Sequence, residues 1–221
     1  MFVELLVVIA IIATLVAISV GGYNKFRSAA DQTAVMGSLR SLQLANTSYA
    51  SDNNGAYVAV YGSSGNWQEI WCWKPEFVDA LFGAGFYAKH EYKYPRSFLD
   101  PVVLKKKWPN TTGLNGSFGA NTHQNPNGWF GKKDFTAQVR VSNVTNPGRT
   151  FSFTTAADWH VGYGGRTSWT PANQNSAKIA YRHGDKAQFV FFDGHVESLT
   201  RAEVNTRSPS QTAPFWNSLA D

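Results

Sequence analysis

The first twenty positions of the chain are almost entirely apolar. Residues 5–20 read LLVVIAIIATLVAISV, and Met1, Phe2 and Val3 extend this run upstream of a single carboxylate, Glu4. A helix of about 20 apolar residues is long enough to cross a bilayer. No basic residue precedes the run, and no small-residue cleavage site with a new domain follows it, so the pattern does not match a signal peptide. It predicts a helix that continues into the polar sequence.

After Gly21 and Gly22 the apolar positions keep a helical spacing. The stripe advances in steps of four, three, three and four residues through Val35, Leu39, Leu42, Ala45 and Tyr49. We place Arg27, Asp31, Arg40 and Gln43 on the other faces. Asp52-Asn53-Asn54-Gly55 suits a helix C-terminus. The pattern predicts one helix of roughly 50 residues and about 75 Å, whose first half must contact lipid or other copies of itself.

The body of the chain after residue 56 reads as short strands separated by long loops rich in Gly, Asn and Pro. We expect few further helices, with one short helix at Glu76–Phe82 after Pro75. The best strand candidates are residues 139–141, 150–154 and 188–192, and Asp193-Gly194 predicts a hairpin turn. The predicted fold class is α+β, with a long N-terminal helix packed on a C-terminal antiparallel β-sheet domain with long loops.

Three regions follow from these patterns: a hydrophobic half-helix at 1–24, its amphipathic continuation at 25–55, and a β-rich globular head at 56–221. Composition agrees with a loop-rich head, since only 16% of residues are charged and 14% are aromatic. The single cysteine, Cys72, excludes an intramolecular disulfide and leaves the compartment open. The net charge of +5 mildly favours anionic partners.

Candidate chemistry is sparse. The sequence has no G-x-S-x-G, H-E-x-x-H, P-loop or EF-hand pattern, and Cys72 has no activating partner evident in the sequence, so we do not expect an enzyme. His183, Asp193 and His195 form a usable set for a divalent metal if the loops bring them together. The alternative, which we favour, is that imidazole and carboxylate form hydrogen-bonded pairs that fix turns, with no cofactor. We assign Asp158 and His160 to turn and core in the same way.

The chain has eight Trp and nine Tyr, and a basic cluster at Lys105-Lys106-Lys107-Trp108. Stacking combined with positive charge would suit nucleic acid or glycan. Aromatic residues are also enriched in protein cores and subunit contacts, and we favour that use.

Three segments resemble known bacterial proteins. The stretch FVELLVVIAIIATLVAISV is similar to the mature N-terminus of type IV pilins and type II secretion pseudopilins. Residues 39–58, LRSLQLANTSYASDNNGAYV, resemble the helix end of the G-type pseudopilin group. His183, nine further residues and then Asp193-Gly194 match the H-X9-DG signature of a prepilin-type subgroup. About half the chain lies outside these resemblances.

The resemblance implies a homo-oligomeric helical filament with assembly residues Met1 and Glu4. Glu4 would meet the residue 1 amine of the adjoining subunit and set the axial register; the alternative is that Glu4 lies at the level of the lipid headgroups. In the family this Glu is the fifth mature residue, so Met1 aligns with the family's second residue. Gly21 takes the place of a common family Pro, and Gly21 and Gly22 would loosen the helix, since each costs roughly 1 kcal/mol relative to Ala.

The same resemblance implies removal of a leader by a prepilin peptidase, N-terminal methylation, and a pilus or secretion assembly machinery as partner. The subunit would lie in the inner membrane before assembly and in an extracellular filament afterwards. Two other classes of function stay open from the residues: a membrane-tethered surface binding protein for glycan or nucleic acid, and a metal-dependent enzyme on a membrane helix. Self-assembly separates the filament subunit from both.

Overall fold

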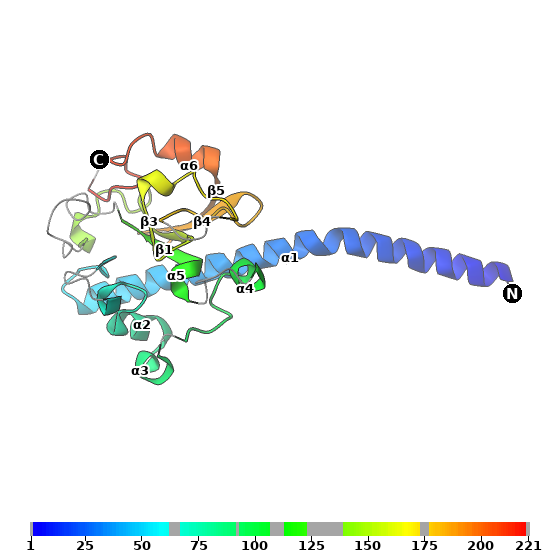
Figure 1. The fold of residues 1–221 in the computed structure, drawn as a ribbon, viewed down its shortest axis with the longest axis horizontal. Coiled ribbons are helices and arrows are strands. Elements are labelled where there is room, and N and C mark those ends of the chain that lie inside the picture. The colour runs from blue at the N-terminus through cyan, green and yellow to red at the C-terminus, as the bar shows by residue number, and fades with distance from the viewer. Residues whose placement is uncertain are drawn as a thin grey trace.

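The computed structural model describes residues 2–61, 67–91, 93–106, 113–122, 139–172 and 177–219, and within these it leaves the side chains of residues 17–22, 24 and 67 undescribed. One long helix, α1 (Phe2–Asp52), projects from a globular head, so that the N-terminus lies far from the rest of the chain (Figure 1). The predicted long helix is confirmed over residues 2–16 and 25–52.

The C-terminal end of α1 is set by its sequence. Gly55 donates its backbone N–H to the Ala50 carbonyl at 2.8 Å, and the chain turns through left-handed backbone at Asn54 (φ 54°) and Gly55 (φ 77°). Asn and Gly are the residues that adopt this conformation at the lowest cost. The predicted helix end at 52–55 is therefore confirmed.

The predicted apolar stripe of α1 is the face that enters the head. All five of its side chains are at most 4% exposed: Val35, Leu39, Leu42, Ala45 and Tyr49. Gln43, predicted on another face of α1 than this stripe, is also buried and only 2% exposed. Its side-chain amide donates to the Phe192 carbonyl at 3.0 Å, and this hydrogen bond offsets the cost of burying a polar group.

A five-stranded sheet forms the centre of the head, in the order β3 (His160–Val161), β1 (Phe118–Asn121), β2 (Phe151–Thr155), β4 (Lys186–Phe191) and β5 (Val196–Thr200). The predicted sheet was purely antiparallel. The structure corrects this to a mixed sheet, because β3 pairs parallel with β1 while the other three pairs are antiparallel. After β2 the chain passes β1. The next strand, β3, then pairs with the other edge of β1 and runs parallel to it.

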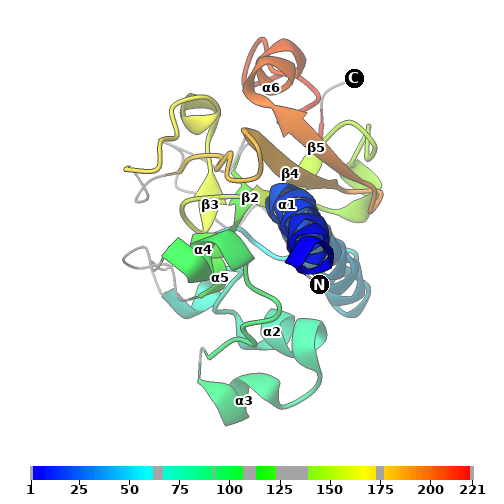
Figure 2. The same ribbon diagram turned by 90° about the vertical axis from the view of Figure 1, so that its right-hand side faces the viewer.

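Both faces of the sheet are covered. α1 crosses one face, with α2 (Pro75–Phe82) on the far side of α1 (Figure 2). The other face packs on α6 (Arg201–Arg207) and on the C-terminal segment, through a second cluster that includes Phe151, Phe189, Trp216 and Val204. A strand buried on both faces has no polar side, so β2 and β4 lack the simple exposed-polar alternation of a one-sided sheet.

A bulge in β2 allows two of its Phe side chains to pack on opposite faces of the sheet, one in the cluster between the sheet and α1 and one in the cluster under α6. Phe151 pairs with Phe191 and Phe153 pairs with Val190, so the register shifts by one residue between them. Side chains two residues apart in a regular strand share a face. Here the bulge places Phe151 in the cluster under α6 and Phe153 in the cluster under α1.

The head holds more helix than the sequence predicted. Over the described residues five α-helices follow α1: α2, α3 (Phe86–His90), α4 (Pro101–Lys106), α5 (Leu114–Ser117) and α6. The predicted helix at 76–82 is confirmed by α2, but the expectation of few further helices was wrong. These helices are four to eight residues long, and such short helices depend on packing against neighbouring elements rather than on a periodic pattern of their own.

Three short 3₁₀ helices complete the described secondary structure: η1 (Trp67–Glu69), η2 (Val141–Asn143) and η3 (Tyr163–Gly165). The prediction of a strand at 139–141 was wrong, because Arg140 forms only an isolated bridge with Ala56 and η2 begins at Val141. The strands predicted at 150–154 and 188–192 are confirmed by β2 and β4, and the Asp193-Gly194 hairpin joins β4 to β5.

Candidate functional site

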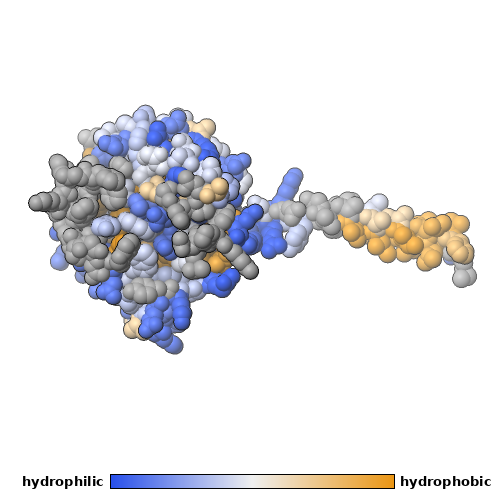
Figure 3. Space-filling model, in the orientation of Figure 1, coloured by the Kyte–Doolittle hydropathy of each residue, from blue (hydrophilic) through white to orange (hydrophobic). Residues whose placement is uncertain are grey.

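The N-terminal part of α1 is an exposed apolar surface, which we call the apolar arm and define as residues 2–16. It stands clear of the head as a continuous hydrophobic surface (Figure 3). Eleven large apolar side chains of the arm are between 51% and 85% exposed: Phe2, Val3, Leu5, Leu6, Val7, Val8, Ile9, Ile11, Ile12, Leu15 and Val16. Single exposed apolar residues are ordinary, but a contiguous apolar surface of this kind marks an interaction site.

The polar groups of the arm suit an apolar partner. The Thr14 hydroxyl donates a hydrogen bond to the Ile11 carbonyl at 2.8 Å, so it already has an acceptor within the helix. Glu4 is exposed and lies in the first turn of α1, where the positive end of the helix dipole favours a carboxylate. The arm therefore carries its one charge near its tip.

The other predicted residues of this region are placed in part. Met1 lies outside the described residues. Gly21 and Gly22 fall within the bounds of α1, between the apolar arm and the head. Over the residues that are described, no helix combines the length and the apolarity needed to cross a membrane.

His183, the first residue of the predicted signature block, forms a buried ionic cluster with two residues from other parts of the chain. Its Nε2 lies 3.3 Å from Asp100 Oδ2, and Arg182 Nη1 lies 3.3 Å from the same oxygen. The three side chains are at most 1% exposed. A carboxylate only accepts hydrogen bonds, so both His183 and Arg182 donate to it.

The electrostatics of the cluster keep Asp100 ionised. Burial by itself raises the pKa of this carboxyl, but the hydrogen bond from His183 and the charges of Arg182 and His183 outweigh burial and lower it. Arg182 also donates to the carbonyls of Gly116 at 3.0 Å and Ala156 at 2.7 Å. A buried charge of each sign is thus paired and hydrogen-bonded, the condition under which buried charges are tolerated.

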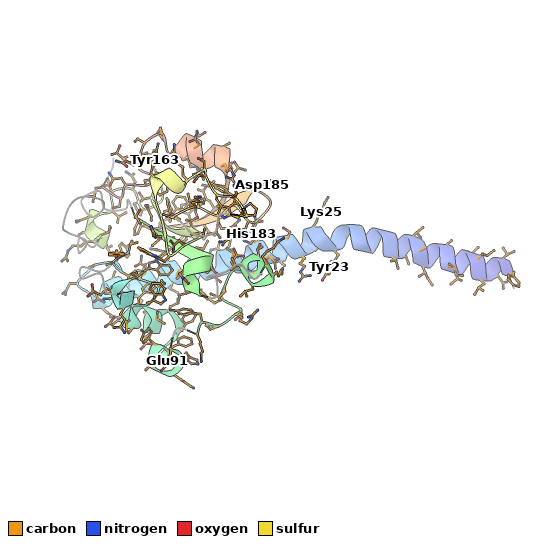
Figure 4. All side chains as sticks on the ribbon, viewed as in Figure 1. Tyr23, Lys25, Glu91, Tyr163, His183 and Asp185 are labelled. Carbon is orange, nitrogen blue, oxygen red and sulfur yellow. The ribbon has the colours of Figure 1, made fainter. Side chains whose placement is uncertain are left out.

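Asp100 connects this cluster to α4. Its Oδ1 accepts from the Val102 N–H at 2.9 Å at the start of the helix, and Pro101 occupies the first helical position. At the other end of α4, Lys105 donates to Asp31 of α1. His183 therefore anchors a short helix, α4, that contacts α1 where α1 enters the head. His183 is labelled in Figure 4.

The Asp193-Gly194 turn forms a second cluster at the other end of β4. Asp193 Oδ1 accepts from the His195 N–H at 3.0 Å and lies 2.5 Å from His195 Nδ1. His195 Nε2 lies 3.2 Å from Glu197, which in turn pairs with Arg207 at 2.7 Å. Gly194 has φ 89°, a conformation that favours glycine. The signature thus spans β4, with His183 before the strand and Asp-Gly after it.

The predicted metal set is not assembled in this structure. His183 lies before β4, whereas Asp193 and His195 lie beyond its end, and β4 covers Lys186–Phe191. A strand of that length separates its ends by about 20 Å. Within the described part of the chain, no group of three or more His, Cys, Asp or Glu side chains is arranged to hold a metal ion.

The remaining sequence candidates belong mainly to the core. Trp159 is 8% exposed, and its backbone N–H donates to Asp158 Oδ1 at 2.8 Å. The Trp residues with described side chains are buried or partly buried: Trp71, Trp73, Trp159, Trp169 and Trp216. Of the basic cluster, Lys105 and Lys106 are exposed at the end of α4, and Lys107 and Trp108 lie outside the described residues.

A hollow of about 360 Å³ opens between α4 and the loop that holds Trp169. Trp169 and Tyr181 line it, but both are buried, and the Arg201 guanidinium lies 5.8 Å and 4.6 Å from their ring centroids. These rings therefore do not offer an open stacking platform for a base or a sugar.

Sequence reasoning missed Asp100 and Arg182. An Asp followed by Pro is a helix-start signal, so Asp100-Pro101 could have predicted α4. No sequence signal pairs Asp100 with His183, which lies 83 residues away.

Comparison of the chain with models of protein families, with curated proteins and with solved structures gives no match.

Proposed function

We propose that this chain is a structural subunit of an extracellular filament of the type IV pilus or type II secretion pseudopilus kind, and that it polymerises through α1. The observation that carries the proposal is the apolar arm, an exposed helix with eleven large apolar side chains and one carboxylate near its tip. Its resemblance to pilin N-termini, and the H-X9-DG signature downstream, support the same assignment.

The energetics favour a partner for the arm. Full burial of one large apolar side chain contributes about 1.5–3 kcal/mol. Burial of the arm's side chains together therefore contributes on the order of 10 kcal/mol or more, which a subunit standing alone in water does not gain. In a filament, the arms of identical subunits would cover one another. Before assembly, the arm would lie in the inner membrane, where prepilin peptidase and the assembly machinery would act on the subunit.

The division of α1 supports this role. Its C-terminal half is held in the head by the buried stripe from Val35 to Tyr49, while the arm projects away from the head (Figure 1). Under this proposal Glu4 pairs with the terminal amine of a neighbouring subunit and sets the axial register.

Removal of residues 1–24 tests the proposal. We expect the truncated chain to be a soluble monomer by light scattering and to form no fibres by electron microscopy. The full chain should require detergent or should form filaments. Fibres from the truncated chain would contradict the assignment of α1 as the polymerisation element.

A further inference from the structure

Basic side chains gather where α1 leaves the head. Lys25 and Arg27 of α1 and Lys105 and Lys106 of α4 are all exposed, and we call these four residues the basic collar. Lys25 lies on the stretch of α1 between the arm and the head (Figure 4). Asp31 is the one acidic residue of α1 between Glu4 and Asp52, and α4 contains none, so the collar with Asp31 carries a net charge of +3.

The collar is held in place by the fold. Lys105 donates to Asp31, which fixes the C-terminal end of α4 against α1. Asp100, held by His183, fixes the other end of α4. The two lysines of α4 therefore lie at the rim of the head that faces the apolar arm, and Figure 2 views this rim from the N-terminal side.

Two exposed aromatic side chains accompany the cations. Tyr23 is 60% exposed and Phe26 is 78% exposed, on the same stretch of α1 as Lys25 and Arg27. Tyr is enriched at the boundary between hydrocarbon and water, where its ring is apolar and its hydroxyl is hydrated. Lys and Arg near the ends of apolar helices extend toward the headgroups. The combination is typical of a helix segment that lies at a membrane surface.

The distances along α1 fit a headgroup layer. The apolar run of the sequence ends at Val20, and at about 1.5 Å per residue Lys25 and Arg27 lie roughly 8 Å and 10 Å beyond it. A headgroup layer is about 5–8 Å thick on each side of a bilayer. Asp31, and with it α4, lies about 16 Å beyond Val20. Lys105, which contacts Asp31, thus lies roughly 8–11 Å outside that layer, a distance comparable to the Debye length of about 8 Å at physiological salt.

We propose that the basic collar binds the anionic phospholipids of the membrane surface and holds the head against the bilayer until the subunit enters a filament. This inference rests on the proposed function, because it requires the apolar arm to lie in the membrane. The partner is an anionic lipid surface rather than a nucleic acid, because the collar lies at the base of an apolar helix and the Trp side chains that are described are not exposed.

Chemical modification of lysines tests the proposal on the full chain. The chain is reconstituted in phosphatidylcholine vesicles with and without phosphatidylglycerol, treated with an amine-reactive reagent and analysed by mass spectrometry. We expect modification of Lys25, Lys105 and Lys106 to slow by about fivefold in the anionic vesicles, from the usual attraction between a Lys and an anionic leaflet. High salt should remove the difference. Lys89 of α3 and Lys93, which follows α3 in the chain, serve as internal controls, because α3 lies on a part of the head away from the arm (Figure 1).

A variant pair sharpens the test. Lys25→Gln with Arg27→Gln should reduce the lipid-dependent protection of Lys106, whereas Lys89→Gln with Lys93→Gln should leave it unchanged. If the chain floats with both vesicle types but its collar lysines are modified at equal rates in both, the collar proposal alone is overturned. Flotation with neither vesicle type would overturn the membrane stage of the proposed function as well. Protection of the collar by a single-stranded oligonucleotide but not by anionic vesicles would assign it to nucleic acid instead.

Discussion

The imidazole Nε2 of His183 lies 3.3 Å from Oδ2 of Asp100, and both side chains are buried. This pair joins the first residue of the H-X9-DG block to Asp100, the residue just before α4. Together with Arg182 it forms the most deeply buried ionic cluster among the described residues. The first residue of the signature therefore fixes the position of a helix, and through Lys105 and Asp31 it supports the base of α1.

Loss of the His183 imidazole should destabilise the head. In His183→Ala, the Asp100 carboxylate loses a donor while still buried, which costs about 1–3 kcal/mol. For a chain of this size each kcal/mol lowers the melting temperature by roughly 2–4 °C. His195→Ala is the matched control, because His195 is 37% exposed and its partners can turn to water, so the change there should be smaller. An unchanged melting temperature in His183→Ala, with a parent that melts higher on addition of a divalent metal, would favour a metal site.

Acid should destabilise the head through His160. Burial lowers the pKa of His160 from 6.5 to about 4, so the folded state holds it neutral while the unfolded chain protonates it below pH 6.5. Stability is therefore fully present above about pH 6.5 and declines as the pH falls toward 4, by up to about 3 kcal/mol. Asp158 acts in the opposite sense, because burial raises its pKa. Melting temperatures from pH 7.5 to 4.5 measure the sum.

His160→Gln isolates the imidazole in that titration. The variant should lose most of the decline between pH 6.5 and 4.5, although its stability at pH 7.5 will differ from that of the parent. A parent and a variant with parallel pH profiles would show that His160 does not titrate in this way. Asp100 acts at lower pH: its pKa is lowered, so its contribution is present above 3.8, its ordinary value, and is lost as the pH falls below it.

Two glycines should respond to alanine in opposite directions. Gly194 has φ 89°, where a side chain is strained, so Gly194→Ala should cost roughly 1–2 kcal/mol. Gly37 lies in α1, and a Cβ built there meets no atom within 4 Å. Gly37→Ala should therefore stabilise the chain by about 0.5–1 kcal/mol. Denaturant titration of both variants checks the pair. A Gly194→Ala variant as stable as the parent would contradict the positive φ of the hairpin turn, and a destabilised Gly37→Ala would contradict the open position of Gly37 in α1.

The sequence predicted best the features that repeat with a short period. The stripe from Val35 to Tyr49 follows the helical period, and all of its members are buried. The Asp193-Gly194 turn was predictable because its residue types are restricted by backbone geometry. In both cases the determinants lie within a few residues of one another.

Long-range contacts explain what the sequence did not predict. Gln43 is polar, and its burial depends on the Phe192 carbonyl, 149 residues away. Asp100 is buried because Arg182 and His183 reach it from another element, and an isolated Asp would be expected at the surface. The parallel pairing of β3 with β1 rests on two residues, His160 and Val161, which is too short a strand to give a periodic signal.

Under the proposed function, subunits assemble through the apolar arm, with Glu4 paired to a neighbour's terminal amine. In Glu4→Gln the amide accepts a hydrogen bond but does not neutralise that ammonium, and an unpaired buried charge costs roughly 3–5 kcal/mol. Every added subunit bears this cost, and each 1.4 kcal/mol is about tenfold in an association constant. Membrane insertion should be unaffected or easier, because a charge has been removed from the apolar helix. Glu76→Gln, an exposed change in the head, is the matched control.

The most direct measurement counts filaments by electron microscopy and membrane-bound subunit by immunoblot in the same cells, for the parent, Glu4→Gln and Glu76→Gln. We predict filaments from the parent and from Glu76→Gln, and a collapse of filament number in Glu4→Gln with membrane-bound subunit at the parent level. Parent-level filaments from Glu4→Gln would place Glu4 at the headgroups and contradict its role in register, and the absence of filaments from the parent would contradict the assembly of this chain through α1.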